Sequence, residues 1–209
     1  MTGRHILIYG ERGSGKTDII DRITEQCCVP VYGFCTRIVK DREDGYHEIY
    51  IYPAGRADGH MSSENYVAAC NTKDRTVNLE AFRILGMKYL EAAEDGIVIM
   101  DEIGFMEEAV PEFCRAVLAH LDGDIPVLAS VKGGKQSDFI DSVLNHPKAE
   151  VFHLDGGNKE QIYDKIWIIY WILMVLLIIL AIEHFIWTRL WPGHHIIPLV
   201  NTSGGATSW

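Results

Sequence analysis

The chain has 209 residues, of which 48% are hydrophobic, so it is long and apolar enough for one folded domain with a sizeable core. Its formal net charge is −10 at pH 7, and nearly all charged residues precede Ile166. Such an acidic domain lacks the basic surface that a nucleic-acid backbone requires, so nucleic-acid binding is not expected. The five cysteines, an odd number without a Cys-x-x-Cys pair, favour free thiols over disulfides or a zinc site.

Apolar runs and helical periodicity alternate in the first part of the chain. The run His5–Tyr9 predicts a buried strand, and the isoleucine spacing in Lys16–Cys27 predicts a helix. Two alternating runs, 31–39 and 47–52, flank an Asp-Gly turn and predict a β-hairpin. The polar, glycine-containing segment 53–75 is expected to be a long loop with short local structure and a candidate lid.

The next part of the chain continues the alternation. Asn78 is expected to cap a helix that continues to about Glu94. Further strands are predicted at 97–100, 125–131 and 151–154, and further helices at 107–121 and 138–144. Strands separated by helices of this length predict an α/β fold in which a mostly parallel sheet carries helices on both faces.

A glycine-rich segment lies between the first predicted strand and the first predicted helix. Gly10, Glu11, Arg12, Gly13, Ser14, Gly15, Lys16 and Thr17 fit the pattern G-x-x-x-x-G-K-[ST]. Its glycines let backbone N–H groups surround a phosphate, and the following helix directs its positive end to the same anion. Lys16 is expected to contact the β- and γ-phosphates, and Thr17 to ligate Mg²⁺. These residues predict a nucleoside triphosphate site, with a glycine-rich turn that binds nothing as the alternative.

A second apolar strand, Ile97–Met100, is followed by two carboxylates. A strand that ends in Asp is typical of the Walker B motif, because ligands bind at the carboxyl ends of parallel strands. Asp101 is therefore predicted to hold Mg²⁺, and Glu102 to polarise the attacking water. A solvated pair of carboxylates at the start of a loop is the alternative interpretation.

Two other segments resemble nucleotide-binding signals only in part. In Asn71–Asp74 the lysine and aspartate are adjacent, which is the wrong spacing for the guanine-binding motif N-K-x-D. Gly133-Gly134-Lys135 lacks the outer glycine and the Ser/Thr of a phosphate loop and is expected to be a turn. Because this turn follows a predicted parallel strand, Ser130 or Lys132 is a candidate to face the γ-phosphate.

The strings 31–37 (VYGFCTR) and 101–107 (DEIGFME), together with the phosphate-loop motif, resemble the cancer-related nucleoside-triphosphatase family over residues 4–165. The resemblance implies a RecA-like P-loop sheet and slow hydrolysis of several nucleoside triphosphates. It also implies the roles of Lys16, Thr17, Asp101 and Glu102 that the motifs predict. The sequence departs from the family at 145–148, where an arginine-rich stretch is expected, and from residue 166 onward.

The run Ile166–Ile182 contains no charged residue. Together with Phe185 to Trp187 it is long enough to predict a C-terminal membrane anchor over 166–187, with tryptophans near both ends. The expected organisation is a cytoplasmic nucleotide-binding domain at 1–165, a membrane helix within 166–191 and a short tail at 192–209. A buried or partner-binding helix, and an extension that is an accident of the reading frame, are the alternatives.

These features predict Mg²⁺-dependent hydrolysis of ATP, GTP and other nucleoside triphosphates with little base preference. A glutamate directly after the strand's aspartate favours water as the acceptor. A kinase for a nucleoside or another small molecule is a second interpretation, with the segment 53–75 and its arginines as a lid. A membrane-tethered, nucleotide-dependent switch is a third.

Overall fold

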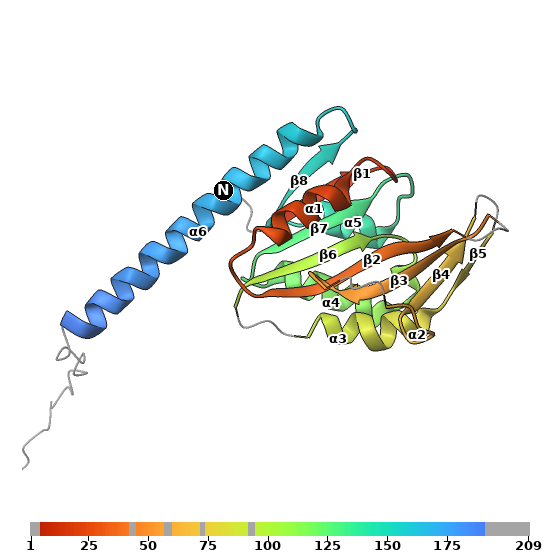
Figure 1. Cartoon of the computed structure of the whole chain (residues 1–209), viewed down its shortest axis with the longest axis horizontal. Coiled ribbons are helices and arrows are strands. Elements are labelled where there is room, and N and C mark those ends of the chain that lie inside the picture. The colour runs from red at the N-terminus through yellow and green to blue at the C-terminus, as the bar shows by residue number, and fades with distance from the viewer. Residues whose placement is uncertain (1–4, 42–44, 57–59, 72–73, 92–94, 191–209) are drawn as a thin grey trace, which may run out of the picture. The chain divides into compact units, whose positions relative to one another are not determined.

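The computed structural model describes residues 5–41, 45–56, 60–71, 74–91 and 95–190. The chain divides into two compact units, Met1–Trp167 and Ile168–Trp209. The first unit is an α/β domain built on one large sheet (Figure 1).

In the described part of the chain, eight strands form this sheet: β1 (His5–Gly10), β2 (Val31–Asp41), β3 (His47–Pro53), β4 (Tyr66–Cys70), β5 (Arg75–Val77), β6 (Ile97–Ile103), β7 (Val127–Lys132) and β8 (Ala149–Leu154). Their order in space is β5-β4-β3-β2-β6-β7-β1-β8. The strands β2, β6, β7, β1 and β8 are parallel to their neighbours in this half of the sheet, whereas β3, β4 and β5 extend it through antiparallel pairs. The predicted mostly parallel sheet and the predicted hairpin β2–β3 are confirmed.

The described helical segments are α1 (Lys16–Glu25), α2 (Leu79–Ala81), the π-helix η1 (Phe82–Gly86), α3 (Met87–Tyr89), the 3-10 helix η2 (Glu107–Ala109), α4 (Pro111–Asp122), α5 (Asp138–Leu144) and α6 (Lys159–Leu190). Helix α1 packs against β1, β6 and β7. Helix α4 lies on the other face (Figure 1), where Phe113, Val117 and Leu121 join the largest core cluster. Because helices cover both faces, the carboxyl ends of the parallel strands remain available for a site.

The long loop predicted over 53–75 is interrupted by a strand. Residues Tyr66–Cys70 form β4, which pairs antiparallel with β3, and β5 begins at Arg75. The run Tyr-Val-Ala-Ala-Cys is short and its alanines give little β signal, so pairing with β3 and β5 determines its conformation. The sheet therefore includes residues 66–70 of the segment that was expected to be a lid.

Two predicted helices differ from the structure at their ends. The Asn78 side chain accepts a hydrogen bond from the Glu80 backbone N–H at 3.2 Å, which confirms the predicted cap. The helical segment that follows ends at Tyr89, before the predicted Glu94. Helix α4 starts at Pro111 instead of Glu107, because proline suits the first helical position, where the missing N–H costs nothing.

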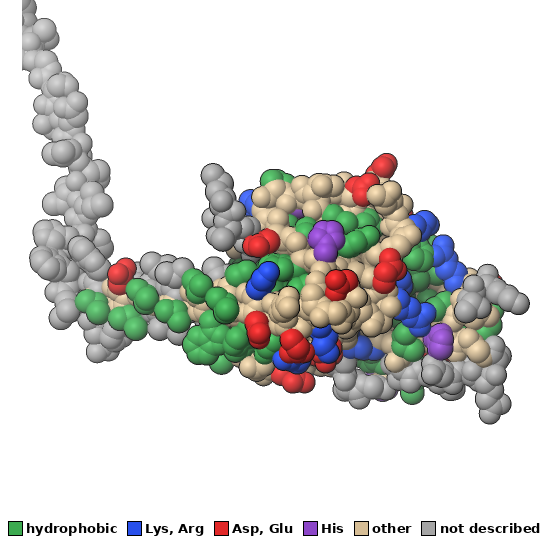
Figure 2. Space-filling view, turned by 90° about the horizontal axis from the view of Figure 1, so that it is seen from above, with side chains coloured by type: hydrophobic (Ala, Val, Ile, Leu, Met, Phe, Trp, Pro, Cys, Tyr) green, Lys and Arg blue, Asp and Glu red, His purple; other side chains and the backbone are tan. Residues whose placement is uncertain are grey.

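The apolar C-terminal run belongs to helix α6. Within the first unit, its Ile162, Tyr163 and Ile166 are buried, so the predicted membrane run begins inside the core of the domain. In the second unit, Figure 2 shows hydrophobic side chains along the helix, and the exposed ones are Ile168, Trp171, Ile172, Val175, Ile179, Ile182 and Ile186.

The prediction of a membrane-spanning helix over 166–187 is not supported. Within the described residues, no helix combines the length and the apolar character that crossing a membrane requires. The predicted tail at 192–209 lies outside the described residues.

The contact between β2 and β6 depends on Gly33. Its φ is +98°, and a Cβ at this position would lie 1.9 Å from the carbonyl oxygen of Ile99. We expect Gly33→Ala to lower the free energy of unfolding by about 3–5 kcal/mol, because left-handed strain adds to overpacking. Gly45 is the matched control, since its φ is +78° but nothing lies within 4 Å. Urea denaturation should show a loss of only about 1–2 kcal/mol for Gly45→Ala, and equal losses would contradict this account.

Candidate active site

The phosphate loop joins β1 to α1, as the sequence predicts. Gly13 and Gly15 have φ values of +80° and +101°, which residues with a Cβ rarely adopt. A Cβ on Gly10 would lie 2.6 Å from the carbonyl oxygen of Leu154. Among the described residues, the buried Ser14 Oγ has no hydrogen-bond partner. A buried polar atom of this kind fits a loop that receives an anion.

Lys16 lies at the start of α1 and is buried. Its Nζ donates hydrogen bonds to the carbonyl oxygens of Gly10 and Glu11 at 2.7 and 2.8 Å. The same Nζ lies 3.1 Å from Glu102 Oε2. The ammonium group is thus held between the phosphate loop and β6, where a bound triphosphate would place its charge.

Asp101 on β6 is fully buried and connects four segments of the fold. Its Oδ1 accepts hydrogen bonds from the hydroxyl of Thr17, at 3.3 Å, and from that of Ser130 on β7. Its Oδ2 forms an ion pair with Arg37 Nη1 at 2.6 Å. Arg37 Nη2 also contacts Asp21 Oδ1 at 2.6 Å, so one guanidinium bridges β2, β6 and α1.

The charge of Arg37 is maintained by these carboxylates. Burial alone would lower the pKa of Arg37, but the net shift is upward because Asp101, Cys35 and Asp21 favour the cation. Burial raises the pKa of Asp21, and Arg37 opposes that shift. The buried charge of Asp101 is therefore compensated by a permanent cation and two hydroxyl donors.

Glu102 is the next residue on β6, and its side chain remains partly exposed. Lys16 Nζ lies 3.1 Å from one of its oxygens, and Lys132 Nζ lies 3.6 Å from the other. Its backbone N–H donates to Thr36 Oγ1 at 3.3 Å. Two ammonium groups therefore flank the Glu102 carboxylate, which the sequence predicts to polarise the attacking water.

Glu107 follows in the turn after β6 and is buried. Its Oε2 accepts a hydrogen bond from the Gly104 N–H at 3.1 Å. Burial raises the pKa of Glu107 to about 7, while the backbone donors of Glu107 and Gly104 act in the opposite direction. This carboxyl group closes the turn that carries Phe105 and Met106.

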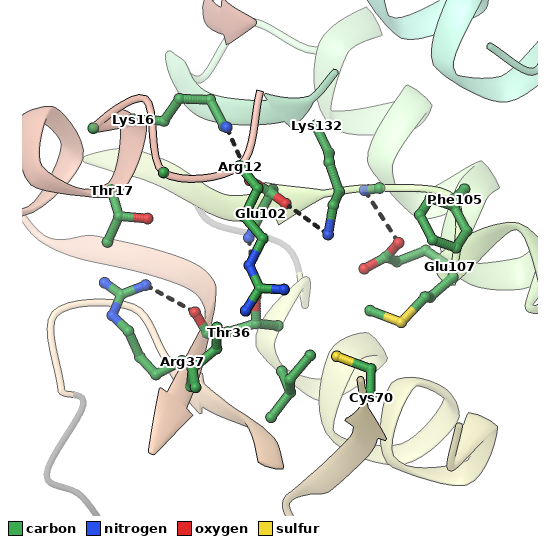
Figure 3. A pocket seen from close by; sticks show the side chains of 16 residues that line it. Arg12, Lys16, Thr17, Thr36, Arg37, Cys70, Glu102, Phe105, Glu107 and Lys132 are labelled. Carbon is green, nitrogen blue, oxygen red and sulfur yellow. Dashed lines mark hydrogen bonds and ion pairs between the residues drawn. The ribbon is translucent and has the colours of Figure 1, made fainter. Parts of the chain in front are cut away.

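A cavity of about 400 Å³ opens in front of these residues. Figure 3 shows Arg12 and Lys132 projecting into it, with Cys70 on the opposite wall. It is lined by Arg12, Gly13, Gly15, Lys16, Thr17, Thr36, Arg37, Ile38, Ile49, Cys70, Glu102, Gly104, Phe105, Met106, Glu107 and Lys132. The structure thus brings the predicted phosphate loop and Glu102 to one cavity, and Thr17 connects the loop to Asp101.

A magnesium ion fits the side chains at this point. Thr17 and Asp101 offer a hydroxyl and a carboxylate oxygen 3.3 Å apart, and these are oxygen ligands that Mg²⁺ prefers. Among the described residues, no group of three or more His, Cys, Asp or Glu side chains could hold a metal by itself. Mg²⁺ commonly binds to one or two protein ligands, with substrate phosphates and water as the others, and Thr17 and Asp101 are two such ligands.

Two side chains of this site, Arg37 and Glu107, were not predicted from the sequence. Arg37 and Glu107 lie within the two family-like strings, but only the resemblance, and no chemical pattern, distinguished them. Ser130 and Lys132 on β7 were the two candidates to face the γ-phosphate. Ser130 contacts Asp101, whereas Lys132 lines the cavity. The turn at Gly133 contacts the phosphate loop, because its N–H donates to the Gly10 carbonyl at 2.9 Å.

The other partial signal, Asn71–Asp74, connects two strands. The backbone N–H of Asn71 donates to the Asp74 carbonyl at 2.9 Å, and the Asp74 N–H donates to Asn71 Oδ1 at 2.7 Å. These bonds close the turn between β4 and β5. The predicted absence of a guanine-binding role at this segment stays a prediction.

Fold and loop together define a P-loop α/β protein of the nucleotide-binding class. The crystal structure of THEP1 from Aquifex aeolicus has this fold: it matches with a TM-score of 0.61 and 23% identity, over 78% of this chain and 96% of that one. A family model described as NTPase matches residues 5–167. The chain therefore belongs to the NTPase family.

Curated relatives agree with that membership. Nucleoside-triphosphatase THEP1 from Thermotoga sp. is 29% identical over 165 residues, which cover 77% of this chain and 92% of the relative. The cancer-related nucleoside-triphosphatase homolog from Bos taurus is 26% identical, over 78% of this chain and 94% of the relative. The family resemblance predicted from the sequence is confirmed.

The buried Glu107 should make stability depend on pH. Its folded pKa of about 7 exceeds the ordinary value of 4.5, so the folded chain binds this proton more tightly than the unfolded chain. The resulting stabilisation is complete below pH 4.5 and is lost as pH rises toward 7. We expect wild type to lose about 2.5 kcal/mol relative to Glu107→Gln between pH 5 and 8 in urea denaturation.

The matched control for this experiment is Glu64→Gln, which changes an exposed glutamate. Its stability should follow the wild-type pH dependence. Parallel pH profiles for wild type and Glu107→Gln would contradict the assignment.

Proposed function

We propose that this chain hydrolyses nucleoside triphosphates to nucleoside diphosphates and phosphate, with Mg²⁺ and with little discrimination among bases. The observation that carries the proposal is the convergence of Lys16, the Thr17–Asp101 pair and Glu102 beside one cavity. The names of the relatives, which are nucleoside-triphosphatases, support the same reaction.

The phosphate loop binds the triphosphate through backbone N–H groups and the N-terminus of α1. Lys16 neutralises charge on the β- and γ-phosphates from its position under the loop. Arg12, which is exposed and lines the same cavity, adds a second cation that faces the phosphates. These groups orient the γ-phosphate toward β6.

Thr17 and Asp101 are the residues that would hold Mg²⁺, with Asp101 acting directly or through water. Bound there, the ion would neutralise charge on the β- and γ-phosphate oxygens. Arg37 and Ser130 keep the Asp101 carboxylate in place for this role.

Glu102 is the group that accepts a proton from the attacking water. It lies next to the Mg²⁺-binding aspartate and its side chain is accessible from the cavity. Lys16 and Lys132 hold its two oxygens from opposite sides and thereby fix the orientation of the carboxylate. A positioned base of this kind contributes about 10²–10⁴-fold to the rate.

The proposed phosphate contacts also imply weak discrimination among nucleotide bases. The residues assigned to binding contact phosphates, and the sequence contains no guanine-binding motif at the required spacing. A strong preference would require buried polar groups that pair with one base. The cytoplasmic location of the domain and its lack of nucleic-acid partners stay predictions from the sequence.

A small-molecule kinase is the second candidate function. The observation that favours it is the continuation of the cavity past Glu102 to Ile38, Ile49 and Cys70. An acceptor hydroxyl in this space would lie on the same side of the γ-phosphate as the attacking water. Hydrolysis remains the primary proposal because Glu102 directly follows Asp101, an order that favours water as the acceptor.

The decisive variant for hydrolysis is Glu102→Gln. We expect it to bind triphosphate and Mg²⁺ but to hydrolyse at least about 10²-fold more slowly, because the base is lost. Phosphate release from ATP, GTP, CTP and UTP measures the effect, and wild-type rates for the four should agree within about tenfold.

Glu64→Gln is again the matched control and should hydrolyse at the wild-type rate. Normal turnover by Glu102→Gln would place the base elsewhere and favour the kinase. A preference of wild type above about a thousandfold for one nucleotide would refute broad specificity.

A further inference from the structure

The cavity in front of Glu102 extends well beyond the phosphate loop. In the sheet, β3 lies four strands from β1, which at ~4.8 Å per strand is roughly 19 Å across the sheet. Ile49 on β3 and Cys70 on β4 nevertheless line the same cavity as the loop. With Ile38 they form an apolar wall that neither phosphate binding nor a single water of ~30 Å³ requires.

Basic side chains gather around one aromatic ring at the edge of this cavity. The guanidinium carbon of Arg75 lies 4.6 Å from the ring centroid of Phe105. Lys135 Nζ and Lys132 Nζ lie 4.7 and 5.7 Å from the same centroid. Phe105 and Lys132 line the cavity, whereas Arg75 and Lys135 are exposed, so the cluster faces solvent at the cavity's rim.

The charge of this cluster is only partly compensated. Lys132 pairs with Glu102 at 3.6 Å. Within the described ranges, no carboxylate lies within ion-pair distance of Arg75 or Lys135. This surplus of positive charge is local, because the whole chain carries a formal net charge of −10.

The energy of surface cation–π contacts is too small to explain why three cations gather around Phe105. Each is worth about 0.5–1 kcal/mol at an exposed site. Here Arg75 begins β5, Lys132 ends β7 and Lys135 lies in the turn that follows, so three segments bring like charges to one ring. Like charges that gather at one ring repel one another, and a bound anion would relieve that repulsion.

We propose that this rim and wall form a site for a second small ligand, a phosphomonoester with an apolar body. Its phosphate contacts Arg75, Lys132 and Lys135, and its apolar part packs against Ile38, Ile49 and Cys70. A dianionic phosphate matches a cluster of cations better than a monoanionic carboxylate does. The inference rests on the proposed function only in that a triphosphate occupies the phosphate loop.

The test uses the full chain with Mg²⁺ and a non-hydrolysable ATP analogue, and phenyl phosphate as the probe. Binding of the analogue is first measured by calorimetry, so a failure there counts against the proposed function and not against this site. Phenyl phosphate is then titrated into the saturated protein. We expect one bound molecule per chain, and at least about tenfold weaker binding of both phenol and inorganic phosphate, which each lack half of the ligand.

The double variant Arg75→Gln, Lys135→Gln removes two of the three cations and should weaken phenyl phosphate binding at least about tenfold, the loss expected for charged hydrogen bonds. Lys88→Gln, which removes an exposed cation from α3, should bind as wild type does. Hydrolysis of ATP should be unchanged in both variants.

Three results would overturn the proposal. The first is no phenyl phosphate binding by the wild-type chain at millimolar concentration. The second is equal binding by the wild type and the double variant. The third is displacement of the ATP analogue by phenyl phosphate, which would place the probe in the phosphate loop.

Discussion

The buried carboxylate of Asp101 is the constraint around which the rest of the domain is arranged. Removing this charge from water is costly unless donors surround it, and Thr17, Ser130 and Arg37 supply those donors from α1, β7 and β2. Arg37 and Ser130 lie on strands of the parallel half of the sheet, and Thr17 lies on the helix that the phosphate loop joins to β1. The order β2-β6-β7-β1 therefore determines where the phosphate loop lies relative to the carboxylate.

The antiparallel half of the sheet adds a wall to the site that Asp101 organises. Because β3 and β4 continue the sheet beyond β2, their side chains extend the cavity past Glu102. The turn after β6 closes this space with Phe105, and the buried Glu107 holds the turn through the Gly104 N–H. The phosphate loop and the apolar wall thus line one cavity at the same edge of the sheet.

Much of this arrangement is predictable because it depends on local sequence. The phosphate loop requires glycines at fixed spacing, and buried parallel strands require apolar runs such as 97–100, so motif and periodicity identify both. The strand Tyr66–Cys70 and the pairing of Arg37 with Asp101 depend on contacts between distant segments, which periodicity does not record. At the start of the C-terminal run, apolar character does not by itself indicate a membrane helix, because Ile166 is buried in the domain, whereas Ile168, Trp171 and Ile172 are exposed.

The most direct test of the account is the Mg²⁺ dependence of phosphate release by Asp101→Asn, compared with Asp21→Asn. Both variants remove a carboxylate that pairs with Arg37, but only Asp101 also contacts Thr17. The account predicts that Asp101→Asn retains triphosphate binding and requires at least about tenfold more Mg²⁺, whereas Asp21→Asn keeps the wild-type requirement. An unchanged Mg²⁺ requirement in Asp101→Asn, or an equal change in both variants, would contradict it.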